Sequence, residues 1–241
     1  MKTYLVNLDR CPARLAFVRE QLERFSLPFE RVSAVDGKSL RRIEIFRKCS
    51  QLHAFAIHNR YLMRGEIGCA LSHLEVYRRM AAENVDLALV LEDDVEFTEE
   101  FPAVLRNGES FVDPAAPQVM LFSSYCDDMP DARRTGILRS PKHFWCTDAY
   151  LITLPAAKAI LHENTPVVTV ADSWCRWERT CGLQLYRIYP TTVRQKGGEF
   201  KTEIGKKGNR SIFMRVYLRV FGSLNPLLDR ALSGWKNRNK G

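Results

Sequence analysis

Residues 87–94 read Leu87-Ala88-Leu89-Val90-Leu91-Glu92-Asp93-Asp94, five aliphatic residues followed by three acids. An unbroken aliphatic run, without the polar alternation of a half-exposed strand, is typical of a strand that is buried on both faces. Such strands occur in sheets that are covered by helices. The run therefore predicts the central strand of an α/β domain, with the three acids at its carboxyl end.

The beginning of the chain predicts a unit that fits beside this strand. Residues 4–8 and 29–35 have the apolar content of short strands, and residues 12–25 between them repeat apolar side chains at helical spacing. A strand, a helix and a strand in about 30 residues form a βαβ unit, whose strands are parallel. We expect further strands at 119–123, 149–153 and 185–189, further helices from Gly65 and near Pro155, and a loop at 107–117. The expected fold is an α/β domain with a mostly parallel sheet flanked by helices.

The positive charge of the chain lies at its end. The whole sequence has 36 Lys and Arg against 28 Asp and Glu, but residues 1–195 contain 25 of each sign, and residues 196–241 contain 11 basic and 3 acidic residues. A body without excess charge argues against nucleic acid as a partner. The composition predicts a domain over 1–195, a basic, glycine-rich, flexible linker over 196–210 and an amphipathic, basic helical tail over 211–241.

The tail has the pattern of a helix that lies on an anionic membrane surface. Ile212, Val216 and Val220 repeat at a spacing of four residues, and Arg215 and Arg219 lie on the other side. A terminal helix packed on the domain is the alternative, because it would show the same pattern. The sequence has no apolar stretch as long as a membrane span, no secretion signal in its first residues and no CxxC pair among its seven cysteines. We therefore expect a cytoplasmic protein with reduced cysteines.

The three acids after the central strand predict a metal site. Adjacent carboxylates repel one another unless a cation intervenes, and open α/β sheets bind ligands at the carboxyl ends of their strands. In an extended segment Glu92 and Asp94 point the same way and Asp93 points elsewhere. Mg²⁺ or Mn²⁺ at Glu92 and Asp94 would neutralise a departing diphosphate. A solvated acidic turn is the alternative, because three more glutamates lie within residues 96–100.

A second polar group follows the first strand at the same ligand edge. It comprises Asn7, Asp9 and Arg10, with Arg14 one helical turn further on. Asn and Asp side chains can hydrogen-bond a base or a ribose, and the fork of an arginine suits a diphosphate. A solvent-exposed helix start would contain the same arginines, so this alternative stays open.

A glycine pair precedes the central strand in the chain. Gly65 and Gly68 stand where a helix begins, and His73 follows on the same helix. Free N–H groups at a helix start favour an anion, and glycines allow its close approach to the backbone. Ordinary turn chemistry explains the two glycines equally well, and a lone His73 equally suits a hydrogen-bonded packing residue.

The order of these blocks resembles glycosyltransferase family 25, over roughly residues 3–195. The similar blocks are residues 4–10 with Arg14-Leu15, 32–37, 65–73 (Gly-x-x-Gly-Cys-x-x-Ser-His), 89–95 (Leu-Val-Leu-Glu-Asp-Asp-Val), 149–153 with 156–158, 170–172 and 189–190. The chain departs from the family pattern at Ala156, where glycine is usual.

The resemblance implies more than the residues alone establish. It implies a GT-A type, Rossmann-like fold, a UDP-linked galactose or glucose donor, a divalent metal (Mn²⁺ or Mg²⁺) and inversion at the anomeric carbon. It also implies a lipid-linked lipooligosaccharide or lipopolysaccharide core as acceptor. A lipid-linked acceptor favours the membrane interpretation of the tail, and with it a place in the bacterial cytoplasm, peripheral on the cytoplasmic face of the inner membrane.

On this interpretation Glu92 and Asp94 hold the metal, and Asp172 is the leading candidate for the catalytic base. Asp172 follows an apolar run over residues 167–170 and matches a family position, although an aspartate before Ser173 could also be a helix N-cap. Asp127 and Asp128 are rival bases. The candidate donor-binding residues are Asn7, Asp9, Arg10, Arg14, Asp36, Gly65, Gly68, Ser72, His73 and Asp93.

Two other functions fit part of the pattern. A nucleotidyltransferase also places metal-binding acids on an α/β sheet, but it usually carries a basic, glycine-rich loop near its start, which residues 7–10 do not provide. A non-catalytic binding module is the second alternative, and the intact acids Glu92 and Asp94 argue against it.

Overall fold

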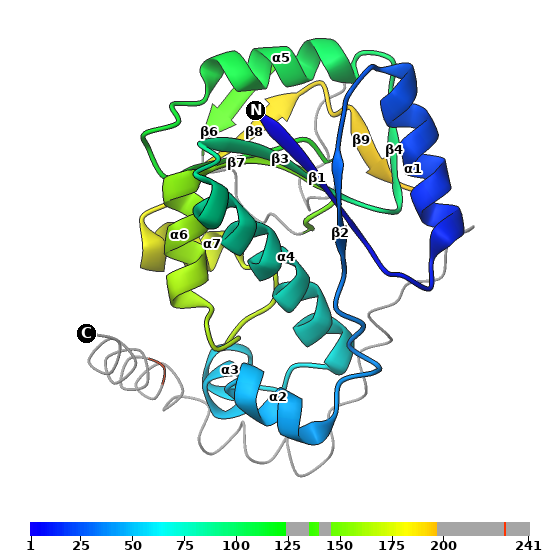
Figure 1. Ribbon diagram of the computed structural model, residues 1–241. Coiled ribbons are helices and arrows are strands. Elements are labelled where there is room, and N and C mark those ends of the chain that lie inside the picture. The colour runs from blue at the N-terminus through cyan, green and yellow to red at the C-terminus, as the bar shows by residue number, and fades with distance from the viewer. Residues whose placement is uncertain (124–134, 140–145, 197–228, 230–241) are drawn as a thin grey trace. The chain divides into compact units, whose positions relative to one another are not determined.

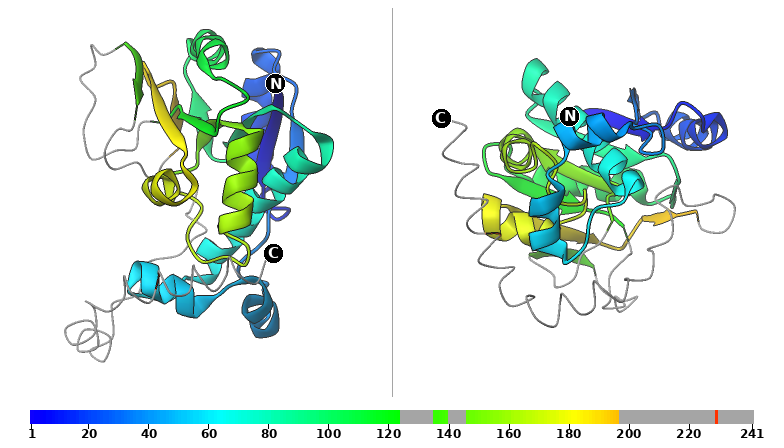
Figure 2. Two further views of the ribbon diagram at one scale, coloured as in Figure 1. Left: turned by 90° about the vertical axis from the view of Figure 1, so that its left-hand side faces the viewer. Right: turned by 90° about the horizontal axis from the view of Figure 1, so that it is seen from below.

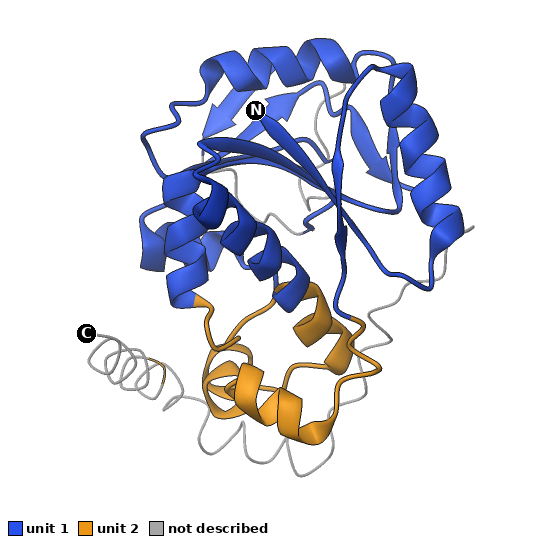
Figure 3. Ribbon diagram, viewed as in Figure 1, with its two compact units in different colours: residues 1–35, 71–163, 171–201 blue, residues 36–70, 164–170, 202–241 orange. Residues whose placement is uncertain are grey.

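The computed structural model describes residues 1–123, 135–139, 146–196 and 229. The chain divides into two compact units (Figure 3): unit 1 holds residues 1–35, 71–163 and 171–201, and unit 2 holds residues 36–70, 164–170 and 202–241. Apart from Lys196 and Asp229, the predicted linker and tail lie outside the described residues, as do the rival bases Asp127 and Asp128.

Unit 1 is built on a seven-stranded sheet with the order β2-β1-β3-β7-β5-β8-β6 (Figure 1). The strands are β1 (Lys2–Asn7), β2 (Glu30–Ser33), β3 (Leu87–Glu92), β5 (Gln118–Leu121), β6 (Gly136–Arg139), β7 (Ala149–Thr153) and β8 (Gln184–Tyr189). Each of the strands expected from the apolar runs is present at or near its predicted position.

The α/β class is confirmed, but the expectation of a mostly parallel sheet is wrong because the sheet is mixed. β1 is parallel to β2 and β3, and β5 is parallel to β8. β7, however, lies antiparallel between β3 and β5, and β6 is antiparallel to β8. An apolar strand buried on both faces has the same sequence pattern in either direction, so periodicity carried no sign of this reversal.

Helices flank the sheet (Figures 1 and 2). Those of unit 1 are α1 (Pro12–Arg24), α5 (Phe101–Phe111), α6 (Leu154–Glu163), α7 (Trp174–Cys181) and the greater part of α4 (Arg64–Glu83). Leu91 of β3 belongs to one core cluster with Leu22 of α1 and Phe101 of α5. On the opposite face, the hydroxyl of Tyr150 in β7 is hydrogen-bonded to that of Tyr77 in α4 (2.8 Å). β3 is thus buried between two helical layers, as its sequence predicts.

The expected loop at 107–117 begins later than predicted, because α5 continues to Phe111. Gly108 weakens the helical pattern in the sequence, but it has a packing role. A Cβ atom at Gly108 would lie 2.8 Å from Met120 Sδ and 3.2 Å from Phe122 Cζ. The missing side chain therefore lets α5 lie close to the sheet.

A two-stranded sheet continues directly from the acids after β3. It pairs β4 (Val95–Phe97) antiparallel with β9 (Val193–Gln195), so that Val95 lies opposite Gln195. The backbone N–H of Lys196 donates to the carbonyl oxygen of Asp94 (2.8 Å). The pairing of β4 with β9 thus fixes the segment that follows the acidic turn.

Unit 2 contains α2 (Arg42–Lys48), α3 (Gln51–His58) and the first turns of α4. Its segment 164–170 is joined to the rest by a parallel bridge between Cys49 and Val167 and by a hydrogen bond between His58 and Thr169 (2.8 Å). The helices α2 and α3 thus occupy the segment between β2 and α4. Among the residues that the structure describes, no helix is both long and apolar enough to cross a membrane.

Candidate active site

The three acids after β3 lie at a turn. Glu92 is the last residue of β3, and Asp93 and Asp94 form the turn that leads into β4. The segment is therefore not extended over these residues, and the simple alternation expected for Glu92 and Asp94 does not apply. Each of the three carboxylates has a different environment instead.

Asp93 joins the turn to β1 and α1. Its Oδ2 accepts a hydrogen bond from Asn7 Nδ2 (2.7 Å), and its Oδ1 accepts one from Arg14 Nη1 (3.0 Å). Burial raises the pKa of Asp93, although the hydrogen bonds from Asn7 and Arg14 oppose this. Arg14 is only 8% exposed and also contacts Asp94 Oδ2 (3.4 Å), so the alternative of a solvent-exposed arginine is wrong for Arg14. Asn7, Arg14 and Asp93, predicted separately, form one buried polar group.

Glu92 contacts α4, on the other face of the sheet from α1. Its Oε1 accepts a hydrogen bond from the hydroxyl of Thr147 and lies 3.2 Å from His73 Nε2. The Nδ1 of His73 is hydrogen-bonded to the hydroxyl of Tyr150 (2.7 Å). Burial opposes the charged form of Glu92, but its interaction with His73 and the hydrogen bond from Thr147 outweigh this effect and lower the pKa of Glu92. His73 is therefore a buried link between Tyr150 and Glu92.

Asp94 has the least satisfied carboxylate of the three. Its Oδ1 is buried and has no hydrogen-bond partner among the described residues. Burial and the charge of Glu92 raise the pKa of Asp94 to about 7, against the effect of Arg14. A carboxylate oxygen without a hydrogen-bond partner is the kind of donor that Mg²⁺ or Mn²⁺ takes. The residues at this turn thus fit a hard divalent ion.

A second set of donors surrounds Glu92. Cys69 lies one turn before His73 on the same face of α4, and Cys69, His73 and Glu92 make a possible metal-binding group. A thiol and an imidazole suit a softer ion than Mg²⁺. Cys69 was not predicted as a ligand, although the spacing Cys-x-x-x-His on a helix is a signal for one.

Asp172 belongs to the acidic region and lies one residue before the N-cap of α7. The N-cap of α7 is Ser173, and the Oδ2 of Asp172 instead accepts a hydrogen bond from the backbone N–H of Cys146 (3.2 Å). The N-cap position itself is thus occupied by Ser173 and not by Asp172. The negative charges of Glu92, Asp94 and Asp172 all act on Asp148, whose pKa is raised well above its usual value, first of all by burial. Asp148 is a site residue that the sequence analysis missed.

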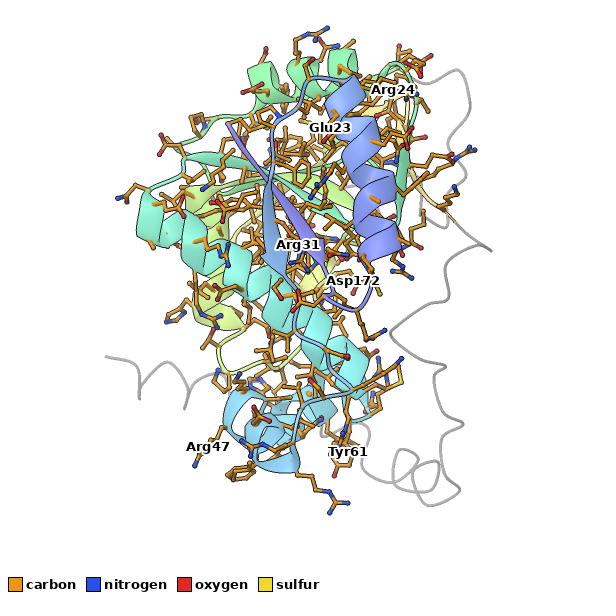
Figure 4. All side chains as sticks on the ribbon, turned by 45° about the vertical axis from the view of Figure 1, so that its right-hand side comes forward. Glu23, Arg24, Arg31, Arg47, Tyr61 and Asp172 are labelled. Carbon is orange, nitrogen blue, oxygen red and sulfur yellow. The ribbon has the colours of Figure 1, made fainter. Side chains whose placement is uncertain are left out.

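Arg31 is a second residue that the sequence analysis missed. From β2 (Figure 4) its Nε donates to Asn7 Oδ1 (2.9 Å), and its guanidinium also forms an ion pair with Asp9. The hydroxyl of Ser33 donates to Asp9 as well (2.9 Å). Arg31 thus connects Asn7 with the exposed carboxylate of Asp9. Arg10, which follows Asp9, is exposed.

Two of the remaining predicted residues accept hydrogen bonds from backbone N–H groups. Ser72 is buried, and its hydroxyl oxygen accepts a hydrogen bond from the backbone N–H of Val35 (2.8 Å). In unit 2, Asp36 Oδ1 accepts one from the N–H of Lys38 (2.9 Å).

Gly65 and Gly68 lie in the first turns of α4, also in unit 2, and a carboxylate of the chain itself already lies at this helix start. It is that of Glu66, which is buried and accepts a hydrogen bond from the backbone N–H of Met63 (2.8 Å). An anion at the start of α4 would have to compete with Glu66, which the sequence analysis did not foresee.

Most of the chain matches the sequence model of one protein family. Residues 1–175 match the model described as glycosyltransferase family 25 (LPS biosynthesis protein). A glycosyltransferase 25 family member of Aedes aegypti is 37% identical over 171 residues, which are 67% of this chain and 28% of that protein. Procollagen galactosyltransferase 2 of Mus musculus is 33% identical over 122 residues, 46% of this chain and 18% of that protein. The chain thus spans less than a third of the length of these curated relatives.

A solved structure gives a more distant likeness. It is described as a crystal structure of a glycosyltransferase involved in the glycosylation of the major capsid of PBCV-1. The likeness covers 84% of this chain and 94% of that chain, with 13% sequence identity and a TM-score of 0.38.

Proposed function

Because the chain belongs to glycosyltransferase family 25, we propose that it moves a hexose, galactose before glucose, from a UDP-sugar to the lipid-linked core of lipooligosaccharide or lipopolysaccharide. The relatives, which include procollagen galactosyltransferases, support galactose. The family description, which names LPS biosynthesis, supports the acceptor. We propose inversion at the anomeric carbon, as a single displacement would give.

One observation carries this proposal: acids from three separate segments of the chain act on one another near the end of β3. Burial is the first cause of the raised pKa of Asp148, and the charges of Glu92, Asp94 and Asp172 raise it further; all four residues lie in unit 1. Such a concentration of negative charge in a largely buried region costs free energy of folding unless cations compensate it. A site that binds a divalent cation, and through it a diphosphate, would supply this compensation.

The proposed roles follow from the surroundings of each side chain. Asp94, whose Oδ1 has no hydrogen-bond partner among the described residues, and Glu92 would hold Mn²⁺ or Mg²⁺, which when bound supplies charge neutralisation at the leaving diphosphate. Asp172 would accept the proton of the attacking acceptor hydroxyl. Arg14 holds Asp93 and Asp94 in place. Asn7, Asp9 and Arg10, which follow β1, stay candidates for contacts to the nucleotide, as do Asp36, Gly65, Gly68, Ser72 and His73 in the segments before β3.

Measurement of UDP release from a panel of UDP-sugars tests this function. We expect the full-length chain to release UDP fastest from UDP-galactose in the presence of Mn²⁺, and to lose most of this activity after treatment with a chelator. A chain that releases pyrophosphate from a nucleoside triphosphate would instead be a nucleotidyltransferase. A chain that releases no UDP from any donor, with acceptor present, would contradict the proposal.

We also propose that the predicted tail holds the enzyme at an anionic membrane surface, near a lipid-linked acceptor. The pattern of apolar and basic residues over 211–241 supports this. Flotation with vesicles that contain anionic lipid measures the association directly. Deletion of 211–241 should abolish flotation, and equal flotation of both proteins would contradict a membrane role of the tail.

A further inference from the structure

Asp148 lies beside Glu92, at the end of the sheet where the acids gather. β7 runs antiparallel to β3 with Ala149 opposite Leu91, so the residue before β7 meets the last residue of β3. The backbone N–H of Glu92 donates to the carbonyl oxygen of Asp148 (2.9 Å). The reversed direction of β7 therefore brings this aspartate to the carboxyl end of β3.

The two carboxylate oxygens of Asp148 differ in their surroundings. The residue is 1% exposed. Its Oδ1 accepts a hydrogen bond from Gln195 Nε2 (2.9 Å). Its Oδ2 is buried and, within the part of the chain that the structure describes, has no hydrogen-bond partner. A buried polar atom without a partner destabilises a fold. A ligand bound to Oδ2 would remove this cost.

Asp94 offers a second oxygen of the same kind. Its Oδ1 is also buried and without a partner among the described residues. Both aspartates are attached to the same strand, because Gln195 of β9 bonds the side chain of Asp148 and the next residue, Lys196, bonds the backbone of Asp94 (2.8 Å). The charge of Asp94 also acts on Asp148. The end of β9 therefore contacts both segments that carry these carboxylate oxygens, Oδ2 of Asp148 and Oδ1 of Asp94.

We propose that Asp148 is a further carboxylate ligand of the divalent cation that Asp94 binds, so that the ion is held between the end of β3 and the start of β7. This inference rests on the metal in the proposed function and adds a ligand to it. Carboxylate oxygens are the ligands that Mn²⁺ and Mg²⁺ take, and an ion there would satisfy both orphan oxygens. A proton on Asp148 is the alternative way to remove its charge, and it requires no metal.

Mn²⁺ binding to the chelator-treated, full-length protein separates these two possibilities. The measurement is isothermal titration with Mn²⁺ alone, on the wild type and on Asp148→Asn. The amide oxygen of the asparagine can still accept the hydrogen bond from Gln195, while its NH₂ group replaces Oδ2 and cannot ligate a cation. We expect Mn²⁺ affinity to fall at least about tenfold. Asp113→Asn, at an exposed aspartate, is the matched control and should bind Mn²⁺ like the wild type.

Thermal melting of the same proteins provides the second readout. Without metal, Asp148→Asn should melt no lower than the wild type, because it removes a buried negative charge among other acids. With Mn²⁺, the melting temperature of the wild type should rise and that of the variant should rise less. If Asp148→Asn melts lower without metal, Asp148→Ala, which removes both oxygens, replaces it in the titration.

Wild-type Mn²⁺ affinity in a folded Asp148 variant would overturn the inference, as would a wild-type protein that binds no Mn²⁺. UDP release by the wild type is measured on the same preparation. Mn²⁺-dependent UDP release together with an unaffected Asp148 variant refutes only the added ligand. No UDP release from any donor refutes the proposed function, while the titration still decides whether Asp148 binds the ion.

Discussion

Asp94→Ala should reduce the transfer rate by about 10³-fold or more and leave the fold intact. The substitution removes the carboxylate whose Oδ1 has no hydrogen-bond partner among the described residues, and with it the main proposed metal ligand. Stability should not fall, because Asp94 adds negative charge beside Glu92 and Asp148. Initial rates of UDP release at saturating donor and Mn²⁺ measure the first effect, and melting followed by circular dichroism measures the second.

The control for this prediction is Asp113→Asn, which changes an exposed carboxylate outside the acidic region. It should retain the wild-type rate. Turnover at the wild-type level in Asp94→Ala would remove Asp94 from the metal site. A large fall in melting temperature would instead assign Asp94 a structural role through its contact with Arg14 (3.4 Å).

Asp172→Asn should lower kcat by about 10²- to 10⁴-fold, with little change in the KM for the donor. The amide can still accept the hydrogen bond from the N–H of Cys146, so the local backbone should keep its arrangement. It cannot accept the proton of the acceptor hydroxyl, however. Steady-state kinetics with varied donor separate kcat from KM, and Mn²⁺ titration checks that the metal site is unaffected.

The rival bases provide the contrast for Asp172. Asp127→Asn and Asp128→Asn are made and measured under the same conditions, and both should retain most of the activity. An unchanged kcat in Asp172→Asn, together with a loss in one of these two variants, would transfer the role of base to that residue. A rise in KM without a fall in kcat would make Asp172 a binding residue.

Local sequence patterns predicted the elements of the fold well. The aliphatic run at 87–91 indicated a doubly buried strand, and β3 lies between two helical layers. They did not predict the direction of β7 or the length of α5. Direction depends on pairing between distant segments, and α5 continues through Gly108 because the missing side chain improves its packing on the sheet.

The candidate site was also predictable in part, where local sequence patterns were enough to identify its residues. Asn7, Arg14 and Asp93 were chosen because each lies near the carboxyl end of a strand, and the structure joins them by hydrogen bonds. Arg31 was not chosen because it lies within β2, where its sequence context gives no sign that it reaches Asn7 and Asp9. Contacts across neighbouring strands depend on register, which a single sequence specifies only indirectly.

The sequence by itself determined the α/β class, the acids at the end of the buried strand and the resemblance to a family that the comparison confirms. These follow from local composition, since hydrophobic runs and adjacent charges need no knowledge of distant residues. Only the tertiary structure decided that Glu92 contacts His73, that Asp172 bonds the backbone at Cys146, and that Asp148 joins the acids. For Asp148 the physical reason is the antiparallel placement of β7 beside β3, and all three contacts join segments that are distant in the sequence.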